Sequence, residues 1–173
     1  NADLTIRNSV TTCTTVVPIQ VIINPNPTAT PGTNPSVCRG VTTAQLTYAA
    51  LIGGNQYSID FDAASEAQGF VDVVATALPA SPISITVPAA AAAATYDATL
   101  RIITSATGCF TSYPITVTVL PNPTITLGAN PQVCVGTTST NLTYSALTVA
   151  DEYSIDFDAT AQGQGFVEVG FTE

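Results

Sequence analysis

Along most of this chain, apolar and polar residues alternate over short stretches. In the segment YSIDFD at residues 57–62, every second side chain is apolar, which is the period of a strand with one buried face. The next residues, Ala63–Gln68, predict one helical turn that begins after the N-cap Asp62 and ends at Gly69. Further strands are predicted at residues 36–38, 45–51, 70–75, 83–87, 96–102 and 115–119.

The pattern repeats itself after 96 residues without insertion or deletion. YSIDFD recurs at residues 153–158, and the cysteine at position 38 recurs at position 134, so both offsets equal 96 (153 − 57 and 134 − 38). A self-similarity of this length indicates tandem copies of one folding unit. In this register, residues 1–24 are the C-terminal strands of a preceding repeat, residues 25–120 are a complete repeat, and residues 121–173 are the N-terminal half of a following repeat.

Each repeat is expected to be all-β. About seven short strands, with a turn signal at roughly every ten residues, are typical of an immunoglobulin-like β-sandwich. Tyr96 opens the penultimate strand after a turn that contains proline, where such folds often place a tyrosine whose hydroxyl fixes the corner. The alanine tract at residues 89–94 is most simply a turn of small residues; a helix there, or over residues 62–68, is the alternative.

Prolines mark the joints between the repeats. The last strand of a repeat runs directly into Pro-Asn-Pro, at residues 25–27 and again at residues 121–123. Because proline fixes its own φ and favours an extended preceding residue, the joints are expected to be short and stiff. Successive repeats are therefore predicted to stack end to end as a rod.

The composition limits the partners that the chain can have. Charged residues make up only 9% of the chain, the net charge is −9, and the basic residues are Arg7, Arg39 and Arg101. A nucleic-acid backbone or an anionic membrane surface would be repelled, and no apolar run approaches the 18 or so residues of a membrane span. A weakly charged surface rich in Thr, Ser and Asn suits an extracellular or cell-surface protein, whose signal sequence is expected to have been removed or to lie upstream.

The four cysteines are expected to form disulfides in an oxidising compartment. In the predicted sandwich, Cys38 and Cys109 are placed at the same end of one repeat, so a Cys38–Cys109 bridge is predicted. It would close a loop of roughly 70 residues, worth about 4 kcal/mol in the chain-entropy model. Cys13 and Cys134 would then find their partners in adjacent repeats or chains. Four free buried thiols are the alternative, whereas a zinc site is disfavoured because the chain has no histidine and no CxxC pair.

Acidic residues are the other candidates for chemistry. Asp60 and Asp62, repeated as Asp156 and Asp158, lie about 7 Å apart on one strand face. They are candidate calcium ligands, because calcium prefers several carboxylate or carbonyl oxygens. A solvated strand face with a helix cap is the simpler interpretation and is favoured, so no metal or other cofactor is expected. Catalysis is not expected either, since the chain has no histidine or lysine to act as a base.

Four segments carry a resemblance to a known family: NPSVCRGVTTAQLTY at 34–48, QYSIDFDAASEAQGFVDV at 56–73, LPASPISITVPAAAAAATYDATL at 78–100, and ATGC at 106–109. Together they resemble the PKD-like, immunoglobulin-like tandem repeats of giant surface adhesins in Bacteroidetes-type bacteria. The resemblance covers essentially the whole chain. It implies export to the cell surface, often by type IX secretion, and a role in adhesion, gliding or filament formation. The family carries no known catalytic residues.

The favoured function is therefore a stiff, disulfide-stapled structural repeat of an extracellular fibre or surface adhesin. A carbohydrate- or surface-binding module is the first alternative, for which Tyr48, Tyr57 and Tyr144 are candidate sugar platforms, although alternation places Tyr57 in the core. An accessory domain of a secreted enzyme is the second. Partial repeats at both ends must be covered by more of the same chain or by strands from a neighbouring copy. Continuation of the same chain is favoured.

Overall fold

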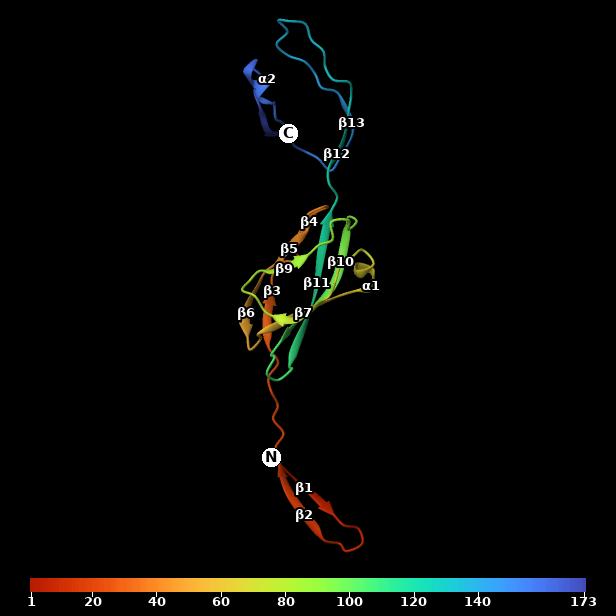
Figure 1. Ribbon diagram of the computed structural model, residues 1–173, viewed down its shortest axis with the longest axis vertical. Coiled ribbons are helices and arrows are strands. Elements are labelled where there is room, and N and C mark those ends of the chain that lie inside the picture. Colours follow the sequence, from red (N-terminus) through yellow and green to blue (C-terminus); the bar gives the residue numbers. More distant parts are fainter.

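The computed structural model describes residues 1–173, and the chain is mostly β. It is elongated, with a central body between an N-terminal hairpin and a smaller C-terminal part (Figure 1). The hairpin consists of β1 (Ala2–Arg7) and β2 (Thr14–Ile19). The C-terminal part contains β12 (Thr124–Leu127), β13 (Tyr144–Thr148), β14 (Tyr153–Ile155), α2 (Ala159–Gly163) and β15 (Val169–Thr172).

The central body holds the remaining elements. They are β3 (Thr28–Pro31), β4 (Ser36–Cys38), β5 (Thr43–Leu46), β6 (Tyr48–Ile52), β7 (Gln56–Phe61), α1 (Ala63–Glu66), β8 (Val73–Ala77), β9 (Ile83–Thr86), β10 (Ala94–Ile103) and β11 (Phe110–Leu120). One sheet has the order β4-β11-β10-β7-β8, in which only the β4–β11 pair is parallel. Opposite it, β3 pairs with β6 and β5 pairs with β9. The two layers share one hydrophobic core of 17 buried residues.

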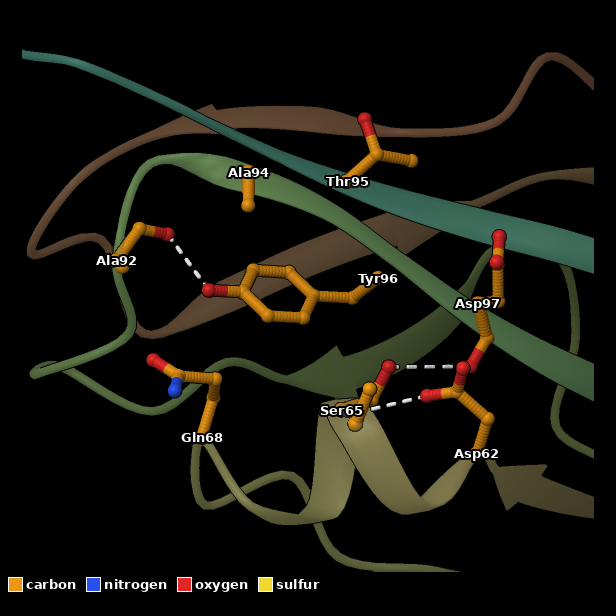
Figure 2. Close-up of a pocket in the computed structure, with 9 residues that line it drawn as sticks. Asp62, Ser65, Gln68, Ala92, Ala94, Thr95, Tyr96 and Asp97 are labelled. Carbon is orange, nitrogen blue, oxygen red and sulfur yellow. Dashed lines mark hydrogen bonds between the residues drawn. The ribbon is translucent and has the colours of Figure 1, made fainter.

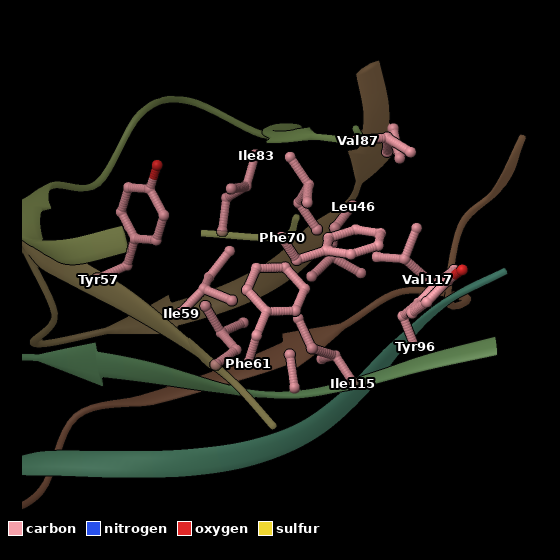
Figure 3. Packing of buried hydrophobic residues seen from close by; sticks show 14 of the residues in the cluster. Leu46, Tyr57, Ile59, Phe61, Phe70, Ile83, Val87, Tyr96, Ile115 and Val117 are labelled. Atoms are coloured by element: carbon pink, nitrogen blue, oxygen red, sulfur yellow. The ribbon is translucent and has the colours of Figure 1, made fainter. Parts of the chain in front are cut away.

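Alternation along the two longest strands builds much of this core. Leu100 and Ile102 on β10 are fully buried, as is Val117 on β11. Figure 3 shows Phe61 and Phe70 in the middle of the core, with Val117 and Tyr96 to one side. The Phe70 ring lies 4.9 Å from Phe61 and 4.5 Å from Tyr96, measured between ring centroids. Burying a side chain of this size contributes about 1.5–3 kcal/mol, so the central body carries its own hydrophobic stabilisation.

Most of the predicted strands are confirmed, with three differences. The strand predicted at 45–51 is interrupted at Thr47, whose carbonyl accepts a hydrogen bond from Gly32 N at 2.7 Å. The strand predicted at 70–75 starts only at Val73, because Phe70 turns into the core instead. The sequence analysis predicts no strand before residue 36, but Thr28–Pro31 forms β3 by pairing with β6.

The pairings of the flanking parts match those of the central body at an offset of 96 residues. Leu4 pairs with Val17 in the hairpin, as Leu100 pairs with Tyr113 in the central body. Thr124 pairs with Thr148, as Thr28 pairs with Ile52. The two helical turns also correspond, since α2 begins after Asp158 as α1 begins after Asp62. The local structure thus follows the sequence offset.

Candidate functional site

A shallow depression of about 390 Å³ lies beside α1 and the start of β10 (Figure 2). Asp62, Ser65 and Gln68 line one side of it, and Tyr96 and Asp97 line the other. The helical turn is held against β10 by the buried Ser65, whose hydroxyl donates to the Asp97 carbonyl at 3.3 Å. Three polar side chains of this depression, those of Asp62, Ser65 and Tyr96, therefore already make hydrogen bonds that hold the fold together.

Asp62 caps α1, as the sequence predicts. Its Oδ1 accepts a hydrogen bond from the Ser65 amide at 2.7 Å, which satisfies one of the free amides at the start of a helix. Hydrogen bonding from Ser65, through its side chain first and its amide second, holds the pKa of Asp62 below its ordinary value. Asp158 caps α2 in the same way, with the Ala161 amide 2.8 Å from its Oδ1.

The aspartates proposed as calcium ligands do not gather into a larger cluster. Asp60 and Asp156 are exposed, while Asp62 and Asp158 serve as caps. Asp72, which follows α1, accepts a hydrogen bond from the Phe61 amide at 2.8 Å. No set of three or more His, Cys, Asp or Glu side chains lies close enough to hold a metal ion. The structure therefore uses three of these carboxylates to fix backbone.

The tyrosines mainly support the fold. The hydroxyl of Tyr96 is 2.7 Å from the Ala92 carbonyl oxygen, to which it donates, so the predicted corner is confirmed. Tyr57 is buried in the core, also as predicted, and Tyr48 is half-buried. Tyr144 is exposed on β13. These three side chains do not form one exposed platform.

The predicted Cys38–Cys109 bridge is wrong. Cys38 ends β4, and its partner in the parallel pairing is Leu120, the last residue of β11. Cys109 immediately precedes the first residue of β11, so the two cysteines lie at opposite ends of this strand, roughly 30 Å apart. The prediction treats the strand that carries Cys38 as the first strand of the repeat. In the structure β3 comes first, and β4 lies beside the end of β11. All four cysteines are free thiols in the structure.

A contact that the sequence analysis missed ties the N-terminal linker to β11. We call it the N-terminal joint, comprising residues 24–29 and residues 109–113. Tyr113 Oη accepts from Ala29 N at 2.9 Å, Thr111 Oγ1 donates to the Pro27 carbonyl at 2.6 Å, and the thiol of Cys109 lies 3.9 Å from the carbonyl oxygen of Asn24.

Cys109, just before β11, and Thr111 and Tyr113 on β11 occupy every second position, so their side chains are expected on the same face of the chain. The spacing of two residues between Cys109, Thr111 and Tyr113 is the feature of the sequence that could have predicted the joint. Pro27 itself is fully buried. A proline with fixed φ, buried and hydrogen-bonded through its carbonyl, makes this linker part of the folded body.

Comparison with protein-family models, with curated proteins and with solved structures gives no match to this chain. The structural class is therefore assigned from the structure of this chain alone: the protein is mostly β and its strands form sheets. No helix of the structure is long and apolar enough to cross a membrane.

Proposed function

We propose that the chain is part of an array of immunoglobulin-like, PKD-like β-sandwich repeats of about 96 residues. The array acts as a stiff spacer in an extracellular fibre or a giant surface adhesin, with adjacent repeats of the same or a neighbouring chain as its partners. The N-terminal joint is the observation that carries this proposal, because it anchors a linker to the body that follows.

Backbone conformations support the repeat. Left-handed residues recur at the same offset: Ala50 has φ of 50° and Ala146 of 51°, and both Gly40 and Gly136 have φ of 92°. A non-glycine residue seldom adopts a positive φ, so a matching pair 96 residues apart (146 − 50) is difficult to explain unless both belong to the same fold.

The arrangement of the linkers supports a rod. The N-terminal linker reaches one end of the central body, and β11 leaves at the opposite end toward β12 (Figure 1). A second body joined through Pro121 would therefore continue in the same direction. Buried proline and three side-chain contacts at the joint restrict bending there.

The exposed apolar faces of the flanking parts support completion by further repeats. Leu4 is 51% exposed, whereas Leu100, its equivalent in the central body, is fully buried. Tyr153 is 53% exposed, and its equivalent Tyr57 is only 9% exposed. Such faces are costly and prone to aggregate when open to water. More of the same chain is the simplest cover, and strands donated by another copy are the alternative.

The weakly charged surface and the resemblance to surface adhesins support a location outside the cell, with export by the type IX route as the proposed path. A structural role is favoured over an enzymatic one, because Asp62 beside the depression caps α1 and Asp72, after α1, accepts a hydrogen bond from the Phe61 amide. Calcium is not part of the proposal.

Small-angle scattering tests the proposal. The chain 1–173 followed by a copy of residues 78–120 completes the C-terminal unit in register. We expect its maximum dimension to exceed that of residues 25–120 alone by on the order of 40 Å per added unit. Units packed side by side would contradict the spacer. Binding of residues 25–120 to a glycan array would instead favour the carbohydrate-binding alternative.

A further inference from the structure

The two cysteines of the central body lie at its two joints. Cys109 is at the N-terminal joint, with its thiol 3.9 Å from the carbonyl oxygen of Asn24. Cys38 is at the opposite end, paired with Leu120, and the next amide, Arg39 N, donates to the Leu120 carbonyl at 2.9 Å. Each cysteine therefore adjoins the last residue before a Pro-Asn-Pro linker.

Those two last residues are equivalent. Asn24 and Leu120 are separated by the repeat length of 96 (120 − 24), and each precedes the first proline of a linker. In an array, the last residue before each Pro-Asn-Pro linker therefore has a cysteine from each of two consecutive units beside it. The cysteine equivalent to Cys38 approaches it from its own unit, and the cysteine equivalent to Cys109 approaches it from the next unit.

The two contacts place the incoming thiol near the residue that follows Cys38. In an array, Leu120 O would accept a thiol from the next unit, as Asn24 O accepts the thiol of Cys109 at 3.9 Å. The same Leu120 O lies 2.9 Å from Arg39 N. The sulfur is then at most 6.8 Å from that nitrogen (3.9 + 2.9), one residue beyond Cys38. Disulfides join residues whose Cα atoms are about 4.4–6.8 Å apart, so the bridge closes when the joint brings the Cα atoms of these two cysteines into that range.

The positions of the two cysteines at opposite ends of β11 disfavour a bridge within one unit, and their exposure leaves both accessible to a neighbouring repeat. Cys38 is exposed and Cys109 half-buried, so neither is enclosed in the core. Val37, beside Cys38, packs against the core, which turns Cys38 outward because side chains alternate along a strand.

We propose that consecutive repeats are cross-linked across each joint by a disulfide between the cysteine equivalent to Cys38 in one repeat and the cysteine equivalent to Cys109 in the next. The inference rests on the proposed array. In the present chain, Cys38 and Cys109 would each bond to a neighbouring repeat, and so would Cys13 and Cys134.

The reaction is an exchange with a disulfide oxidant such as oxidised glutathione. One cysteine thiolate attacks the oxidant, forming a mixed disulfide and releasing one thiol. The second cysteine thiolate then attacks the mixed disulfide and releases the other thiol. The protein gains one S–S bond and loses two protons and two electrons, and the oxidant is reduced to two thiols.

Disulfide mapping of a completed two-unit chain tests the proposal. This chain is residues 1–173 followed by a copy of residues 78–120, with Cys13→Ser to simplify the map. It is refolded with reduced and oxidised glutathione, its free thiols are blocked, and it is cut with trypsin, which cleaves after Arg7, Arg39, Arg101 and the copied Arg101. We expect peptide 8–39 to be linked to the last peptide, which holds the second copy of Cys109.

Two results would overturn the proposal. One is peptide 8–39 linked to the peptide that begins at Ile102, which holds Cys109 and Cys134 and so would pair Cys38 with a cysteine other than the second copy of Cys109. The other is a folded chain in which every thiol remains open to alkylation after oxidation. Cys38→Ser should abolish the cross-link. Small-angle scattering from the Cys38→Ser variant tests the array separately from the disulfide. A variant that is still extended supports the array whether or not the bridge forms.

Discussion

The hydroxyl of Tyr113 accepts a hydrogen bond from the amide of Ala29 at 2.9 Å, across 84 residues of sequence. The bond joins the first strand after a linker to the last strand of the same body. It is one of three contacts that make the N-terminal joint a packed structure, the others being those of Thr111 and Cys109.

Tyr113→Phe should therefore destabilise the central body. The substitution removes the acceptor and leaves a half-buried amide unpaired, which costs about 1 kcal/mol. Urea unfolding of the chain measures it. Tyr144→Phe is the matched control, because Tyr144 is 60% exposed. Equal unfolding midpoints for the two variants would show that the bond contributes nothing.

Tyr96→Phe tests the corner beside α1. Tyr96 is 4% exposed and donates to Ala92 O at 2.7 Å in a part-buried contact, so losing the hydroxyl removes the hydrogen-bond partner of that carbonyl. We expect a loss of about 1–2 kcal/mol in the free energy of unfolding. The ring still fills its place against Phe70, so the folded structure should persist, which near-ultraviolet circular dichroism would check. A variant as stable as the parent would contradict the assignment.

Asp62→Asn should change how stability depends on pH. The pKa of Asp62 is lowered in the folded chain from 3.8, so its contribution is fully present above the unfolded value and is lost as the pH falls through the lower folded value. The urea midpoint should therefore fall less between neutral pH and about pH 3 in the variant than in the parent. The parent loses the contribution of its charged cap on acidification, and the variant has no such charge to lose. Asp60→Asn is the control, because Asp60 is exposed on β7, two residues before Asp62.

Leu100→Ala and Leu4→Ala compare equivalent positions in different surroundings. Leu100 is fully buried, so its truncation should cost about 2–5 kcal/mol. Leu4 is 51% exposed, so the main unfolding transition of the 173-residue chain should not move. A large effect of Leu4→Ala would mean that the hairpin already packs against something in this chain.

Local features could be predicted from the sequence because they depend on neighbouring residues. The alternation around Ile59, the cap at Asp62 and the corner at Tyr96 all follow from period and spacing. Features set by partners far along the chain could not. β3 contains four residues and becomes a strand only through β6, and Cys38 could be placed only once β4 was known to pair with the end of β11.

The parallel pairing of β4 with the end of β11 has a mechanical consequence. Tension applied between the two linkers pulls β3 and β4 toward the N-terminal joint and β11 in the opposite direction. Bonds such as Arg39 N to Leu120 O and Thr118 N to Pro35 O lie across the direction of pull, so they are loaded together in shear and do not open one at a time. Each unit should then resist stretching until it yields abruptly. Single-molecule force spectroscopy would record this as evenly spaced peaks, and a gradual extension would contradict it.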